Sequence, residues 1–393
     1  MTAAARRSFA DAVIAAYRGW HALVERHSGW EDAKFVLIND LSRSAVPPTS
    51  FADEKEVGVA LRKLLDRAPD QVSAERLQQS LFYLEQRPGR RVTKDDVERR
   101  GIPWRQFDDS VLDGLRDEFN NCRRDLVDSG QLTRSESLSR YERRMGEPGV
   151  AENIRALGET HLRRLYDAFP NLSRANFEAR EVSSGRPWTN MVTFEDDRIR
   201  LVANRGELSD LGEWRRGFLA LHEVAGHVLH FTQLLADETL RAQTPDRLCL
   251  AIHTYDAYFI EGVAQFITSV YLDRIAPGPT LLRMDVKRSE VWFAVRHKNL
   301  SELIDGRIDP ARAAAREAEY VGGEESKLRA VYEKILEDAF FCCQTLVYLP
   351  SHRALLPALD FDDARLAEFL GALLTGYHTP GDLDRLVVTA PSA

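Results

Sequence analysis

The sequence has few cysteines and no long uncharged apolar run. Only four of its 393 residues are cysteine, and their spacing forms neither a disulfide framework nor a CxxC metal motif. No segment approaches the roughly 18 uncharged apolar residues that a membrane-spanning helix needs. We therefore expect a cytoplasmic protein with no membrane span and no membrane partner.

Basic residues are also too few to favour a nucleic acid partner. Lys and Arg number 53 against 61 Asp and Glu, so the formal net charge is -8, which repels phosphate backbones. The 44% of hydrophobic residues are enough for a large buried core and exclude general disorder. Asp11, Tyr17 and Arg18 interrupt the N-terminal segment before it reaches signal-peptide length, so we expect an amphipathic first helix there.

Apolar residues recur at helical spacing through most of the chain. The segments with this pattern are 8–145, 151–169, 259–272, 328–349 and 363–374. Alternating apolar residues at 191–194 and 198–202, on either side of the acidic stretch 195–197, predict one β-hairpin. The sequence therefore predicts a mainly α (α+β) fold, with one small β-hairpin or sheet beside the helix that carries the candidate site.

Proline and glycine at 146–149 mark the best candidate boundary between regions of the chain. We expect an N-terminal helical region at 1–146 and a metal-binding catalytic region at 147–393. The two regions could equally form one continuous two-lobed domain. The oligomeric state stays open.

The candidate site lies in the apolar segment 218–230, which contains His222, Glu223 and His227. Ionisable groups in such a segment are costly unless they are paired or bind a metal. In a regular α-helix, residues five apart are about 140° apart around the axis, against about 40° for the HExxH spacing. One shared metal ion therefore requires a wider turn, and we predict a π-type turn at 222–227, made easier by Gly226.

Glu261 is the next carboxylate in an apolar helical segment and supplies a candidate third ligand. With His222, His227 and Glu261 holding one Zn²⁺ per chain, Glu223 is left to take a proton from the metal-bound water, whose pKa zinc lowers toward about 7. The residues therefore predict a metallohydrolase. A widened turn would also suit manganese, cobalt or iron.

The motifs HEVAGH at 222–227 and EGVAQF at 261–266 resemble those of the glutamate-ligand zincins (gluzincins). The HExxxH spacing resembles dipeptidyl peptidase III and the tyrosine carboxypeptidases that trim tubulin tails. Roughly residues 185–390 are similar to a largely unassigned bacterial hydrolase family. That family has a His-Glu-x-x-Pro-Gly-His helix, a Glu-Gly-Trp-Ala helix and a C-terminal Gln-Ala-x-x-Tyr helix, which the segment 344–348 matches.

This chain departs from that family at four points. The proline is missing, the histidine motif is one residue shorter, Val263 replaces the tryptophan and Ser351 stands in place of a glycine. The resemblance implies a zinc-dependent metalloprotease-like hydrolase that cleaves a peptide or a small amide. It also implies that the strand at 189–194 or 198–202 lies beside the substrate, which makes Met191 and Thr193 candidate substrate-binding residues.

Hydrolysis of a carbonyl compound also needs a donor that stabilises the oxyanion. We favour Tyr348, Tyr377 and His378 for this catalytic role, because they fall in the C-terminal segments that resemble the hydrolase family. His253 and Tyr255 are weaker candidates. Arg353 follows Tyr348 by five residues and could bind a substrate carboxylate through its planar guanidinium.

Two other functions remain open. A helical non-haem di-iron oxygenase would use Glu223, His227 and Glu261 as iron ligands, although a second carboxylate-histidine set is not evident. A catalytically degenerate protein would keep the metal and bind a peptide or another partner without cleaving it.

Overall fold

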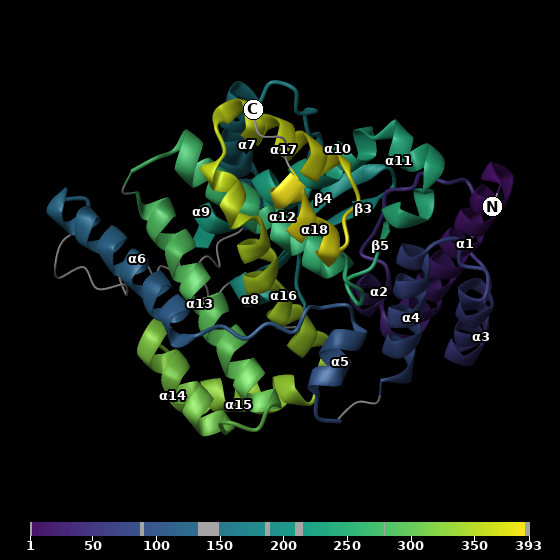
Figure 1. Cartoon of the computed structure of the whole chain (residues 1–393), viewed down its shortest axis with the longest axis horizontal. Coiled ribbons are helices and arrows are strands. Elements are labelled where there is room, and N and C mark those ends of the chain that lie inside the picture. Colours follow the sequence, from purple (N-terminus) through teal and green to yellow (C-terminus); the bar gives the residue numbers. More distant parts are fainter. Residues whose placement is uncertain are drawn as a thin grey trace.

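Helices make up most of the fold, as the sequence predicts, and one small sheet completes it (Figure 1). The computed structural model describes residues 2–86, 90–132, 149–184, 189–208, 215–278 and 280–389. The boundary expected at 146/147 lies outside these residues. No helix in the described ranges is long and apolar enough to span a membrane.

The N-terminal helices contribute to three hydrophobic clusters, of which the largest contains Val97. The helices are α1 (Ala3–Ser28), α2 (Trp30–Val36), α3 (Glu54–Leu65), α4 (Gln71–Glu85), α5 (Lys94–Arg99) and α6 (Asp109–Asp128). Helices α1, α3 and α4 pack around buried residues such as Tyr17, Trp20 and Leu61. Helix α6 instead packs against α13 (Leu281–Ile304), far from α1 in the fold (Figure 1).

The remaining helices form the larger core. They are α7 (Val150–Ala168), α8 (Arg205–Leu208), α9 (Arg215–Leu219), η2 (Ala220–Val228), α10 (Leu229–Ala236), α11 (Glu238–Gln243), η3 (Pro245–Leu248), α12 (Asp256–Val270), η4 (Tyr271–Ile275), α14 (Pro310–Val321), α15 (Glu325–Leu336), α16 (Ala339–Leu355), η5 (Leu356–Asp360), α17 (Asp363–Thr375) and α18 (Pro380–Thr389). The segment 328–349, which has a helical pattern in the sequence, is divided between α15 and α16. Helix α15 ends at Leu336. A new helix, α16, starts at Ala339, because the Asp338 side chain caps it by accepting hydrogen bonds from the backbone N–H groups of Phe340 and Phe341.

The predicted hairpin is confirmed. Strands β3 (Asn190–Glu195) and β4 (Arg198–Asn204) pair antiparallel. The two residues between them, Asp196 and Asp197, both have positive φ angles, 51° and 60°. This is the left-handed conformation that a tight two-residue hairpin turn requires.

The sheet has five strands in the order β2-β4-β3-β1-β5. The sequence pattern missed β1 (Asn39–Asp40) and β5 (Cys249–Leu250), since two-residue strands have no measurable period. It also missed β2 (Phe177–Val182), in which Phe177 alone is buried. Strand β1 lies between β3 and β5. The regions 1–146 and 147–393 thus share one sheet, while their division into domains stays a prediction.

The candidate-site helix is held at the centre of the core. The π-helix η2 contacts α7, α12 and the sheet strands β3 and β4. Gly158 of α7 permits the first contact, since a Cβ atom there would lie 2.4 Å from the Cβ of Val224. Every residue of η2 is buried, so the ionisable groups on it have little exposure to solvent.

Candidate metal centre

The helix that carries the two histidines is a π-helix, as the HExxxH spacing predicts. The segment Ala220–Val228 continues directly from α9 and into α10, so the widened turns sit inside one long helix. Hydrogen bonds from residue i to i+5 place residues five apart near the same face. The rings of His222 and His227 consequently lie 4.8 Å apart between centroids, at 84°.

Gly226 brings this helix against α12, the element that carries Glu261. A Cβ atom on Gly226 would stand 2.8 Å from the Cβ and 2.9 Å from the Cα of Ala264. Any larger residue would separate the two backbones. We predicted that Gly226 eases the irregular turn, and the structure adds this second role, the close contact between the helices.

The three candidate ligands meet at one point. Nε2 of His222 lies 3.3 Å, and Nε2 of His227 lies 3.6 Å, from Oε2 of Glu261. Zinc bonds of about 2.0–2.2 Å in a tetrahedron place ligand atoms about 3.3–3.6 Å apart. Within the described ranges, Glu261 Oε2 is buried without a hydrogen-bond partner, and these three residues are the one candidate metal group. The donor set therefore fits a zinc ion.

The candidate ligands stabilise the charged forms of Glu261 and His227. Burial raises the pKa of Glu261, but the adjacent His227 and His222 outweigh it and lower that pKa to about 2. Burial lowers the pKa of His227, and the charge of Glu261 overcomes this and raises it. Glu261 is therefore an anion at neutral pH. A carboxylate ligand needs that state.

Glu223 lies next to the ligands and lines the same cavity. Its side chain is buried, and this burial raises the pKa of its carboxyl group. A raised pKa brings a carboxylate toward the value at which a general base works near neutral pH.

The three ligands and Glu223 open into a cavity of about 540 Å³. Its wall is mostly aromatic and aliphatic, with Met191 of β3 among the lining residues. A volume of this size accommodates a small molecule or a short peptide. The other predicted strand residue, Thr193, is fully buried and does not line the cavity.

Tyr348 is the candidate oxyanion donor that the structure brings to this cavity. Its ring stacks on Phe293 at 4.4 Å between centroids. Burial, reinforced by the negative charge of Glu261, holds the pKa of its hydroxyl well above the usual value, so the group remains a hydrogen-bond donor. Gln344, one turn before it, donates from Nε2 to Glu261 Oε1 at 3.3 Å. Gln344 belongs to the motif at 344–348, but the sequence pattern alone assigns it no role.

Three predicted site residues do not line the metal cavity. The Tyr377 hydroxyl donates a hydrogen bond to buried Asp256 at the start of α12. His378 bonds through Nε2 to the carbonyl oxygen of Ala372 at 3.1 Å. Arg353 lies over the Phe107 ring at 5.7 Å. Tyr377 thus anchors α12, and the geometry gives none of these side chains a place beside the ligands.

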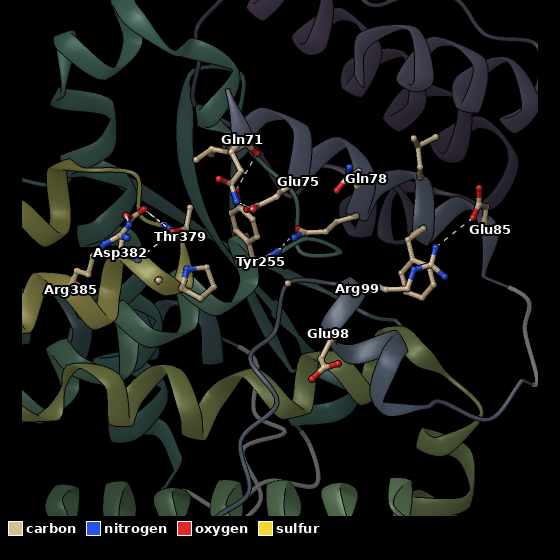
Figure 2. A pocket seen from close by; sticks show the side chains of 17 residues that line it. Gln71, Glu75, Gln78, Glu85, Glu98, Arg99, Tyr255, Thr379, Asp382 and Arg385 are labelled. Carbon is tan, nitrogen blue, oxygen red and sulfur yellow. Dashed lines mark hydrogen bonds and ion pairs between the residues drawn. The ribbon is translucent and has the colours of Figure 1, made fainter. Parts of the chain in front are cut away.

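The two weaker candidates have structural partners. His253 Nδ1 bonds to the Phe35 carbonyl oxygen at 2.9 Å, and its Nε2 bonds to Ser80 Oγ at 2.9 Å. Tyr255 lines a second, larger cavity of about 810 Å³. Figure 2 shows that this cavity lies between α4 and the start of α18, with Gln71 and Glu75 on one side and Thr379 and Asp382 on the other. It shares no lining residue with the metal cavity.

The sheet presents one strand to the metal cavity. Strand β4 is hydrogen-bonded on both sides, to β2 and β3. Strand β3 pairs with β4 on one side and meets the short strand β1 on the other, where Phe194 is opposite Asn39 and Asn39 Nδ2 donates to the Val192 carbonyl oxygen. The Asn204 N–H donates to the Thr189 carbonyl oxygen. In an antiparallel pair, the backbone N–H and C=O groups of every second residue of β3 therefore point away from β4. Two of these residues, Asn190 and Val192, are in the cavity wall.

Comparisons with known proteins give the fold and no family. No family model and no curated protein matches the chain. A protein of Colwellia psychrerythraea described as a "putative lipoprotein" has a similar structure, with a TM-score of 0.58 and 15% identity over 95% of this chain and 68% of its own.

A second solved structure, a "putative lipoprotein of unknown function" of Shewanella oneidensis, has a TM-score of 0.52 and 11% identity. The match covers 85% of this chain and 64% of that protein, so this chain spans less than two thirds of that neighbour. Identities this low show a shared fold alone.

Proposed function

We propose that this chain is a zinc-dependent hydrolase of peptide or amide bonds. One observation carries the proposal: Nε2 of His222 and His227 and Oε2 of Glu261 converge at tetrahedral spacing on the wall of a largely apolar cavity. A zinc ion held there would supply Lewis acidity and lower the pKa of water.

Three other polar residues of the cavity have roles in this proposal. Glu223 would take the proton of the attacking water and return it to the leaving amine. The Tyr348 hydroxyl would donate a hydrogen bond to the oxygen of the tetrahedral intermediate. Gln344 holds Oε1 of Glu261, which keeps Oε2 turned toward the two histidines.

A di-iron oxygenase is less well supported by the same geometry. Such centres draw four carboxylates and two histidines from facing helices. In the ranges that the structure describes, the one candidate group contains a single carboxylate with two histidines. Metal analysis separates the two functions directly.

The first test is metal content by mass spectrometry, on protein purified without added metal, together with His227→Ala. We expect about one zinc per wild-type chain and less than a tenth of that in the variant. Two irons per chain would favour oxygen chemistry instead. Equal metal in both proteins would contradict the site. Turnover of peptide and amide libraries by the zinc-loaded protein then tests hydrolysis against simple binding.

We also propose a cytoplasmic location. All four cysteines are buried free thiols, which suits a reducing compartment. The description of both fold neighbours as lipoproteins supports a lipid-anchored protein as the alternative. Cell fractionation distinguishes the two, because recovery of the chain in the membrane fraction would contradict a cytoplasmic location.

A further inference from the structure

The metal cavity has two cations in its wall besides the metal-binding residues. Arg296 of α13 and Lys334 of α15 both line it, and neither side chain was singled out from the sequence. Arg296 is mostly buried, with 16% of its side chain exposed, whereas Lys334 is exposed. The basic pair, Arg296 and Lys334, therefore lies partly at the cavity rim.

Arg296 is held so that part of its guanidinium stays available. Its Nε donates to Glu317 at 3.1 Å and 3.3 Å, and its guanidinium lies 4.3 Å from the Trp292 ring centroid. Within the described part of the chain, every hydrogen bond of Arg296 uses Nε, which leaves the two terminal nitrogens for another acceptor. Guanidinium groups positioned in this way bind carboxylates strongly.

The Lys334 side chain has no hydrogen-bond or ion-pair partner among the residues that the structure describes, and the only hydrogen bond of this residue outside its helix is from the Glu337 N–H to its carbonyl oxygen. The nearby acid that lines the cavity, Asp338, already accepts two backbone hydrogen bonds at the start of α16. The other carboxylates of the wall, Glu223 and Glu261, belong to the metal end. Two of the three carboxylates in the wall therefore lie at the metal end, and the third, Asp338, has one oxygen engaged by the start of α16.

Apolar groups separate the basic pair from the metal. Tyr348 beside Glu261 stacks on Phe293 at 4.4 Å, and Arg296 follows Phe293 by about one helical turn, roughly 5 Å along α13. The neighbouring wall residues are mostly apolar, with Asp338 among them; the apolar ones are Trp292, Val331, Ile335, Phe340 and Phe341. A ligand that reaches both ends must therefore have an apolar body.

We propose that this cavity selects apolar amides that end in a carboxylate, and that Arg296 and Lys334 bind the carboxylate while the aromatic wall binds the body. This inference rests on the proposed hydrolase function and adds its substrate class. It also places the carboxylate-binding role on the basic pair rather than on Arg353, which lies over Phe107 outside the cavity wall.

The test compares N-acetyl-leucyl-phenylalanine with its C-terminal amide, two probes that differ only in the charged end. Calorimetric titration uses zinc-loaded Glu223→Gln protein, so that neither probe is consumed. We expect the acid to bind about tenfold more tightly than the amide. Arg296→Gln and Lys334→Gln together should abolish this preference and leave amide binding unchanged.

Three further variants make the outcome specific. Lys334 is exposed, so Lys334→Gln alone carries little risk of misfolding and should lower acid binding about threefold. Lys327→Gln, on the same helix and also exposed, is the matched control and should change nothing. Loss of the preference in Arg353→Gln, or an unchanged preference in the double variant, would overturn the inference.

Kinetics on the unmutated Glu223 background separate this inference from the hydrolase proposal. The double variant should raise KM for an acid substrate about tenfold and leave kcat unchanged. Preferential acid binding without any cleavage would support the recognition and count against the hydrolase. Cleavage of acid and amide with equal KM would support the hydrolase and contradict the recognition.

Discussion

Gly262 of α12 is in close contact with Ser351 of α16. A Cβ atom on Gly262 would stand 2.9 Å from the Cβ of Ser351 and 3.3 Å from its carbonyl carbon and oxygen. Glu261 immediately precedes Gly262, and Gln344 and Tyr348 lie on α16. The spacing of these two helices therefore decides whether a metal ligand and the candidate oxyanion donor face one cavity.

Gly262→Ala tests this contact. The added methyl group must push α12 and α16 apart, and overpacking of this kind costs about 1–3 kcal/mol of unfolding free energy. We expect that loss in urea melts, together with a weaker affinity for zinc. Gly114→Ala, in helix α6 with no atom within 4 Å of the new Cβ, is the control and should be neutral or slightly stabilising. Equal behaviour of the two variants would show that the helix spacing tolerates a side chain.

Glu223→Gln should separate metal binding from catalysis. The amide keeps the size of the side chain but cannot accept a proton from water, so kcat should fall by about 10²–10⁴. Zinc content should remain near that of the wild type, since Glu223 is not among the three grouped ligands. Mass spectrometry and a peptide or amide hydrolysis assay measure the two effects. Wild-type turnover in this variant would rule out Glu223 as the base.

Tyr348→Phe should reduce kcat by about 10²–10³ with little change in KM, because the hydroxyl would act on the oxyanion of the transition state. Tyr377→Phe removes a hydrogen bond to buried Asp256 and should instead cost about 1–3 kcal/mol of stability. Steady-state kinetics and urea melts of both variants distinguish the roles. A larger kcat loss in Tyr377→Phe would return the catalytic role to that residue.

Buried histidines should make the protein acid-sensitive. Burial lowers the pKa of His253 to about 3 and that of four other histidines to about 4; these are His21, His161, His297 and His352. Their unfolded-state pKa is about 6.5. Because each folded-state value is the lower one, the stability they support is complete above about pH 6.5 and is lost as the pH falls toward 4.

The contribution of one of these histidines to that slope can be measured. In urea melts between pH 7 and pH 5, His253→Gln should flatten the fall in unfolding free energy by up to about 1.4 kcal/mol per pH unit. His27→Asn, at an exposed position of α1, should reproduce the wild-type slope. An identical slope in all three proteins would mean that other groups cause the acid sensitivity.

Sequence spacing was sufficient for the local features of the site. His222 and His227 are five apart, and only a turn closed by i to i+5 hydrogen bonds brings them to one face. The π-helix follows from that requirement. The hairpin is local as well, because alternation on both sides of a short acidic turn pairs β3 with β4. Glu261 could be selected because a carboxylate in an apolar helix needs a partner.

Tertiary structure alone decided which distant side chains meet these ligands. Tyr348 and Tyr377 looked alike in the sequence, yet one lines the metal cavity and the other bonds to Asp256. Arg296 had no motif around it and reaches the cavity wall only because α13 packs beside α16. Periodicity identifies the buried face of a helix, but the neighbour of that face depends on packing between segments far apart in the chain. Local spacing is therefore enough to select the candidate ligands and the turn that joins them, whereas the cavity, its aromatic wall and its basic pair depend on packing between distant segments.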